Sequence, residues 1–349
     1  MNWNNESYHK TFSHIYVEDA ARDWPLTDVL LKRFADAQVI PIKHYLDVFS
    51  PHRQDFFMQK QAPKLILAVK EGNLVYPGAP VCQSFGNEHF YYTSNIMNCL
   101  YDCEYCYLQG MYPSANLVLF VNLPDILSQV DELLKKHPVY LCISYDTDLL
   151  ALEGLTGHVK TWLDFASSRP NLTIECRTKA ARLLDYPVPE KGLADRFVFA
   201  WTLSPDSIIK DYEHHTPSLQ ARLHALCHAL KQGYRVRLCF DPMLRLPGWQ
   251  SLYADLFETV FQKIETECPS ALTSGQIADV SIGTFRISKE YLSRMRKNRP
   301  DSLIVGYPFR TENGYCSYGS EADLEMMAYA KEKLTKWISP EQIFQWKEK

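Results

Sequence analysis

The pattern of apolar and polar residues along this chain predicts strands and helices in alternation. After residue 85, six apolar runs of strand length are separated by stretches with helical periodicity. The strand-like runs are His89–Thr93, Tyr140–Ser144, Leu172–Cys176, Phe197–Leu203, Val236–Phe240 and Val280–Gly283. The helical stretches include Leu123–Lys136, Leu155–Ala166, Ser218–Lys231 and Ser251–Glu265. This alternation favours parallel strands joined by right-handed crossovers, and so an α/β barrel with its chemistry at the C-terminal strand ends.

The first 85 residues predict a smaller α/β region. We expect a helix over Leu26–Ala37 and strands at Val39–Ile42 and Leu65–Val69. A further apolar run, Leu117–Asn122, indicates an extra strand between the first barrel strand and the first barrel helix.

These segments suggest three parts of the chain. An N-terminal α/β region over residues 1–85 would pack on a barrel over residues 86–300. A hairpin and a helix over residues 301–349 would form an extension on the substrate side of the barrel.

Composition narrows the class of protein. The chain has 349 residues, of which 46% are hydrophobic and 22% charged, as in a compact globular protein. Its net charge of −4 lacks the basic excess of a protein that coats nucleic acid nonspecifically. A basic stretch at Lys289–Arg299 is either a local phosphate contact or a solvated helix face. Because no long apolar run occurs, we expect a cytoplasmic protein with no membrane partner.

Three of the ten cysteines form a tight motif directly after the first barrel strand. Cys99, Cys103 and Cys106 are spaced C-x3-C-x2-C. Three thiolates on one loop can hold three irons of a [4Fe–4S] cluster and leave the fourth iron open to a cofactor such as S-adenosyl-L-methionine (SAM). A zinc site is the alternative, but it normally needs a second cysteine pair or histidines at defined spacing, and none follows this loop.

The loop Cys99–Gln109 resembles that of the spore photoproduct lyases, which are radical SAM enzymes of DNA repair. Shorter similarities follow in order and extend over most of the chain, from about residue 15 to residue 335. They are Phe120–Asn122, Asp146–Leu149, Leu155–Thr156, Thr178–Lys179, Ile209–Glu213, Lys231–Tyr234, Pro242, Gly248–Trp249, Leu256–Glu258 and Arg286–Lys289.

This resemblance implies a partial (β/α)6, TIM-like barrel of the radical SAM type that binds a [4Fe–4S] cluster and SAM. It implies a carbon–carbon lyase that uses a 5′-deoxyadenosyl radical to reverse the methylene bridge of a thymine dimer in UV-damaged DNA. Damaged DNA and an external electron donor, such as flavodoxin or ferredoxin, would be its partners. A lyase-like enzyme that acts on another nucleic-acid lesion or on a small substrate remains an open alternative.

The resemblance also assigns roles to single residues. Tyr105, Thr147, Lys179 and Thr202 fall where the family binds SAM, although threonine replaces serine at two of these positions. Tyr107 matches a tyrosine that relays a hydrogen atom or an electron. Each residue also has an ordinary alternative, such as a core tyrosine, a capping hydroxyl or a surface cation.

Two departures from the family concern the substrate side. Tyr145 stands where the family has its hydrogen-donating cysteine. The donor here is therefore Tyr145 itself or another thiol, with Cys142, Cys82 and Cys316 as candidates. The family's arginine-rich hairpin is replaced by Phe309–Tyr318, which contains a single arginine. The identity of the cofactor is thus better supported than that of the substrate.

Overall fold

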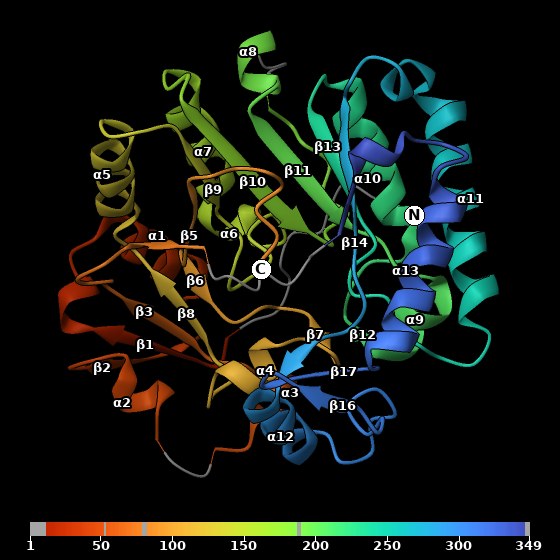
Figure 1. The fold of residues 1–349 in the computed structure, drawn as a ribbon. Helices are drawn as coiled ribbons and strands as arrows, with labels where there is room; N and C mark the ends of the chain where they lie inside the picture. Colours follow the sequence, from red (N-terminus) through yellow and green to blue (C-terminus); the bar gives the residue numbers. More distant parts are fainter. Residues whose placement is uncertain (1–11, 52–53, 79–81, 187–189, 346–349) are drawn as a thin grey trace.

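The computed structural model describes residues 12–51, 54–78, 82–186 and 190–345. The six predicted barrel strands lie side by side in chain order, and all of them are parallel (Figure 1). They are β5 (Phe90–Thr93), β9 (Val139–Cys142), β10 (Leu172–Thr178), β11 (Phe197–Thr202), β13 (Arg235–Cys239) and β14 (Ile277–Ile282). The predicted α/β fold with a partial barrel is confirmed.

Two short strands extend this sheet at its edges. β18 (Ile343–Gln345) pairs in parallel with β14, and β4 (Val75–Pro77) pairs antiparallel with β5. Phe85, in the loop before β5, contacts strands that lie far apart in the sheet order. Its ring centroid lies 5.5 Å from that of Phe344 in the edge strand β18 and 6.4 Å from that of Tyr140 in β9. An aromatic contact thus connects one edge of the sheet with a strand near the other edge.

A second sheet lies beside the barrel and is mostly parallel (Figure 1). Its strand order is β2–β1–β3–β8–β6. The bounds are β1 (His14–Glu18), β2 (Gln38–Ile42), β3 (Leu65–Ala68), β6 (Ile96–Met97) and β8 (Leu117–Phe120). The predicted extra strand is therefore β8, and it joins the N-terminal strands. The segment that carries the three cysteines runs from β6 to β8, both of which lie in this second sheet.

Most predicted helices form close to their expected bounds. They are α1 (Pro25–Arg33), α5 (Leu123–Leu134), α10 (Leu219–Lys231) and α11 (Trp249–Glu267). The predicted helix over Leu155–Ala166 is wrong as a single element. Gly157 has a φ of +65°, which ends α6 (Glu153–Thr156) before α7 (His158–Ser167) begins.

The chain ends in a small sheet and a long helix. β15 (Ile287–Ser288) leads into α12 (Lys289–Asn298), and the hairpin β16 (Arg310–Glu312) and β17 (Tyr315–Ser317) pairs back onto β15. Asn313 and Gly314 both have positive φ, as a tight two-residue turn requires. The helix α13 (Ser320–Leu334) follows.

The fold also contains several shorter helical elements. They are α2 (Leu46–Phe49), α8 (Lys191–Ala194), η1 (Asp19–Ala21), η2 (Pro269–Leu272) and η3 (Pro340–Gln342). Across the ranges given above, none of the helices is both long and apolar enough to span a bilayer.

A buried ionic group lies inside the barrel. The register places Glu175 of β10, Arg237 of β13 and Asp279 of β14 on the same face of the sheet. The Arg237 guanidinium binds both carboxylates, and its Nη1 donates to the Tyr140 hydroxyl at 2.6 Å. All four side chains are buried. Because each charge is paired, the group fills the barrel without leaving an isolated ion.

Because of this buried ionic group, we expect the substitution Arg237→Met to destabilise the protein strongly. The substitution leaves Asp279 buried without a cation and Glu175 with only Arg177, whose Nε lies 3.5 Å away, and we expect a loss of about 3–5 kcal/mol in the free energy of unfolding. Urea denaturation measures it. The control is Lys160→Ala, which removes an exposed pair with Asp164 at 2.6 Å and should cost no more than about 0.5 kcal/mol. A loss from Arg237→Met no larger than that of the control would contradict the role of the group.

Candidate functional site

The three motif cysteines lie close together on one loop. Cys103, in β7 (Asp102–Cys103), is buried, and Cys99 and Cys106 are partly buried. Burial raises the pKa of all three thiols, that of Cys99 to about 11, and the charge of Cys106 raises the pKa of both others. Such a set of three neighbouring thiols suits three irons of a [4Fe–4S] cluster. Within the described ranges, no three His, Cys, Asp or Glu side chains are grouped as ligands of a single metal ion.

The loop is held from two sides by cations. From α3 (Phe56–Gln61), Lys60 Nζ donates to the carbonyl oxygens of Cys99 at 2.8 Å and Tyr101 at 2.9 Å. From the C-terminal end of α12, Arg299 forms an ion pair with Asp102. These contacts fix the backbone around the first two cysteines.

The basic stretch Lys289–Arg299 mostly binds the protein itself. α12 packs on α4 (Leu108–Met111), the helix that directly follows the third cysteine. Arg294 Nη1 donates to the Gly110 carbonyl at 3.1 Å, and Arg296 Nε donates to the Val305 carbonyl at 2.7 Å. A Cβ on Gly110 would lie 2.6 Å from backbone atoms of Tyr291, so only glycine permits this contact. This stretch therefore supports the cysteine loop more than it offers cations to phosphates.

A buried carboxylate supports the loop from a third side. Glu213, in β12 (Glu213–His214), pairs with Cys103 across the β7–β12 ladder. It accepts hydrogen bonds from Tyr105 Oη and, at 2.7 Å, from Ser204 Oγ, and it forms an ion pair with buried Arg222. Burial alone would raise the pKa of Glu213, but the charges of Arg222 and Lys179 and these hydrogen bonds hold it at about 2. Glu213 is thus ionised and fixes the Tyr105 ring.

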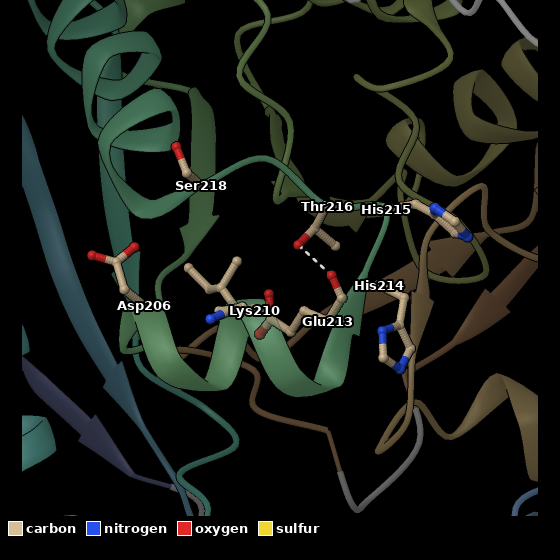
Figure 2. Close-up of a pocket in the computed structure, with 8 residues that line it drawn as sticks. Asp206, Lys210, Glu213, His214, His215, Thr216 and Ser218 are labelled. Carbon is tan, nitrogen blue, oxygen red and sulfur yellow. Dashed lines mark hydrogen bonds between the residues drawn. The ribbon is translucent and has the colours of Figure 1, made fainter.

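A surface pocket lies on the outer side of this carboxylate strand (Figure 2). It is formed by α9 (Asp206–Tyr212), by β12 and by the turn that leads to Ser218. Figure 2 shows Thr216, whose hydroxyl donates to the Glu213 carbonyl at 2.7 Å. The pocket contains none of the residues that the sequence predicts to be functional.

The structure places the predicted SAM contacts at neighbouring strand ends. Thr147, Lys179 and Thr202 follow or end β9, β10 and β11. The Lys179 ammonium lies 5.4 Å from the centroid of the Tyr105 ring. Asp148 joins two of the strand ends, because its carboxylate accepts from the backbone N–H of Lys179 at 2.6 Å and from the Thr178 hydroxyl at 2.7 Å.

One hydroxyl at this rim, meaning the neighbouring ends of the barrel strands, lacks a hydrogen-bond partner. Thr147 Oγ1 is buried and forms no hydrogen bond with any part of the chain that the structure describes. A buried hydroxyl without a partner is costly unless a ligand binds it. The three thiols, this hydroxyl and the Lys179 cation therefore fit an iron–sulfur cluster together with a polar cofactor.

Three candidate hydrogen donors converge near the same rim. Cys82 Sγ lies 3.4 Å from Tyr145 Oη, within hydrogen-bond distance for sulfur. Burial raises the pKa of Cys142 to about 12, and the charge of Cys82 contributes to that rise, so the two thiols are neighbours. Tyr107 Oη donates to the Tyr145 carbonyl. Cys316 lies instead in β17 of the hairpin, 3.3 Å from the Thr311 hydroxyl.

Sequence reasoning missed three supporting residues, Glu213, Arg222 and Lys60. Glu213 lies inside one of the segments that resemble the family, so its position carried a signal, but no role. Lys60 lies in the unremarkable stretch FFMQKQ, and Arg222 looks like a surface cation of a helix. Only the folded structure shows that all three are buried beside the cysteine loop.

Comparison with known proteins agrees with this geometry. The family model described as "Spore photoproduct lyase" matches residues 89–294, which is more than half of the chain. The spore photoproduct lyase of Clostridium acetobutylicum is 23% identical over 271 residues, covering 72% of this chain and 75% of the relative. That of Bacillus subtilis is 23% identical over 261 residues, covering 70% and 71%.

Solved structures show the same fold. A spore photoproduct lyase complexed with dinucleoside spore photoproduct superposes with a TM-score of 0.80 at 17% identity, covering 97% of this chain and 98% of the other. A double mutant of a spore photoproduct lyase, with bound AdoMet and dinucleoside spore photoproduct, has a TM-score of 0.77 at 18% identity, covering 97% and 100%. With a family model matched across the whole cysteine loop and all six barrel strands, the chain belongs to the spore photoproduct lyase family.

Proposed function

We propose that this protein is a carbon–carbon lyase that repairs the spore photoproduct in UV-damaged DNA, restoring two thymines. One observation carries the proposal: Tyr107, which directly follows the third motif cysteine, donates a hydrogen bond to the carbonyl of Tyr145, and Tyr145 Oη lies 3.4 Å from the Cys82 thiol. Membership of the family, and the dinucleoside spore photoproduct bound in two related structures, support the choice of substrate.

The residues that would bind the cofactors lie in the cysteine loop and at the neighbouring ends of the barrel strands. Cys99, Cys103 and Cys106 would hold a [4Fe–4S] cluster, and the cluster with SAM would supply a carbon-centred radical that removes a hydrogen atom from the substrate. The Lys179 cation suits the methionyl carboxylate of SAM, and the Thr147 hydroxyl is free to bind a polar group. Tyr105, held by Glu213, would pack against the cofactor, and Thr202 would complete the rim.

The chain's own donor groups complete the reaction. After the methylene bridge breaks, the product thymine radical needs one hydrogen atom. Cys82 gives the hydrogen of its thiol to carbon, which leaves a sulfur radical on Cys82. Tyr145, whose Oη lies 3.4 Å from Cys82 Sγ, then passes its phenolic hydrogen atom to that sulfur. The tyrosyl radical that remains takes one electron from the external electron donor and one proton. Tyr107 fixes the Tyr145 backbone by its hydrogen bond and is the next tyrosine in line for the relay.

A second function is favoured by one observation. Arg294, Arg296 and Arg299 bind the protein itself, which leaves fewer cations for the phosphates of a long DNA site. This favours a lyase-like enzyme that acts on another nucleic-acid lesion or on a small substrate. Both functions use the same cofactors and an external electron donor such as flavodoxin or ferredoxin.

The first test of the proposal is a repair assay. Anaerobically reconstituted protein, given SAM, a reductant and dinucleoside spore photoproduct, should form 5′-deoxyadenosine and thymine. Cys103→Ser should abolish both products because it removes a cluster ligand. Cys268→Ser changes a buried cysteine after α11 and should retain both. Release of 5′-deoxyadenosine without thymine would reject the substrate and favour the second function.

A second test locates the hydrogen donor. In Cys82→Ala, the lesion should still be consumed, but the thymine yield should fall at least about tenfold, which corresponds to about 1.4 kcal/mol between competing barriers. Adducts of the unquenched radical should replace the thymine and are measured by chromatography with mass spectrometry. Tyr145→Phe should still form thymine in the first turnover, because Cys82 donates directly, but should slow later turnovers because the Cys82 radical is no longer quenched.

Two matched variants complete this test. Cys316→Ala removes the hairpin thiol and should leave the product distribution unchanged. If instead Cys142→Ala diverts the products while Cys82→Ala does not, the donor is Cys142, and the role given to the Cys82–Tyr145 pair is wrong.

A further inference from the structure

Lys60 is a buried cation that none of the steps above uses. It lies in α3 of the N-terminal part of the chain, and only 7% of its surface is exposed. Its ammonium group reaches the cysteine loop and donates to the carbonyl oxygens of Cys99 at 2.8 Å and Tyr101 at 2.9 Å. A lysine is rarely buried to this extent unless its charge is compensated.

Lys60 differs from the other cations near the loop in its lack of a carboxylate. Arg299 pairs with Asp102, and Arg222 pairs with Glu213. Lys179 interacts electrostatically with the Glu213 carboxylate and helps to lower the pKa of Glu213. Among the residues that the structure describes, no Asp or Glu forms an ion pair with Lys60. Its positive charge is therefore not cancelled by a neighbouring carboxylate.

The ammonium group lies directly against the loop that carries the motif thiols. It is within hydrogen-bond distance of the backbone of Cys99, an expected iron ligand, and of Tyr101, which lies between the first two cysteines. Its positive charge is therefore held beside the expected position of the cluster. Its contacts with backbone carbonyls also hold the start of the loop in place.

We propose that Lys60 is the fixed counter-charge of the iron–sulfur centre, positioning the loop and raising the reduction potential of the cluster. This rests on the proposed cofactor. A cluster held by three thiolates is negative and gains one further negative charge on reduction. A nearby positive charge stabilises the reduced form more than the oxidised form, because Coulomb energy scales with the charge of the partner. Lys60 is thus a positioning residue that makes electron uptake easier.

The test compares three variants by their reduction potentials. Reconstituted Lys60→Gln, Lys60→Met and Lys60→Arg are assayed for iron and sulfide and titrated by EPR without SAM or substrate. Gln retains an N–H donor for the carbonyls but no charge, and Arg retains the charge. We expect a more negative midpoint potential for Gln and Met, and a potential near that of the unmodified protein for Arg.

The control is Lys64→Gln, because Lys64 lies in the same region but binds Ser13. A four-iron Lys60→Gln protein with an unchanged or more positive potential would overturn the proposal. If the Lys60→Gln and Lys60→Met proteins bind no iron, the Lys60→Arg protein provides the test. Full iron content in Lys60→Arg would support a requirement for the positive charge, and a Lys60→Arg protein without iron would overturn the proposal.

This outcome is separable from that of the proposed function. The potential is measured without substrate, so failure to form thymine leaves the result on Lys60 intact. An unchanged potential in a repair-active protein would reject only the role of Lys60. Unmodified protein that assembles no iron–sulfur cluster would instead reject the proposed function.

Discussion

The fixation of one short loop by buried charges is the constraint on which the rest of this structure depends. Three thiols must face a common point, and as thiolates they bring negative charge into a region that excludes water. The chain meets this demand with an ion pair at Asp102, a second at Glu213 and a lysine without a carboxylate at position 60. Each contact comes from a different element, so the loop is ordered only when the whole fold is assembled.

This constraint explains why the two sheets form one functional unit. The cysteine segment starts at β6 and ends at β8, in the N-terminal sheet, whereas Thr147, Lys179 and Thr202 lie at the ends of barrel strands. The rim is completed where the two sheets meet. A substitution in the N-terminal part, far from the cysteines in sequence, therefore acts directly on the site.

The sequence predicts the parts of this protein that depend on local pattern. Six parallel strands, most of them buried, appear as apolar runs, and the cysteine spacing marks the loop by itself. The sequence pattern did not show which sheet β8 joins, because an apolar run of four residues fits the barrel sheet and the N-terminal sheet equally well. It also missed the helix break at Gly157, since a left-handed glycine leaves no trace in periodicity. The contact of Cys82 with Tyr145 joins residues 63 positions apart and needed the fold.

In the proposed centre, three thiolates hold a four-iron cluster whose fourth iron is open to SAM. Mössbauer spectroscopy of protein reconstituted with ⁵⁷Fe, before and after addition of SAM, tests it directly. We expect four irons per chain, of which one changes its spectrum when SAM is added. Zinc in the loop, or a four-iron centre in which no iron responds to SAM, would contradict it.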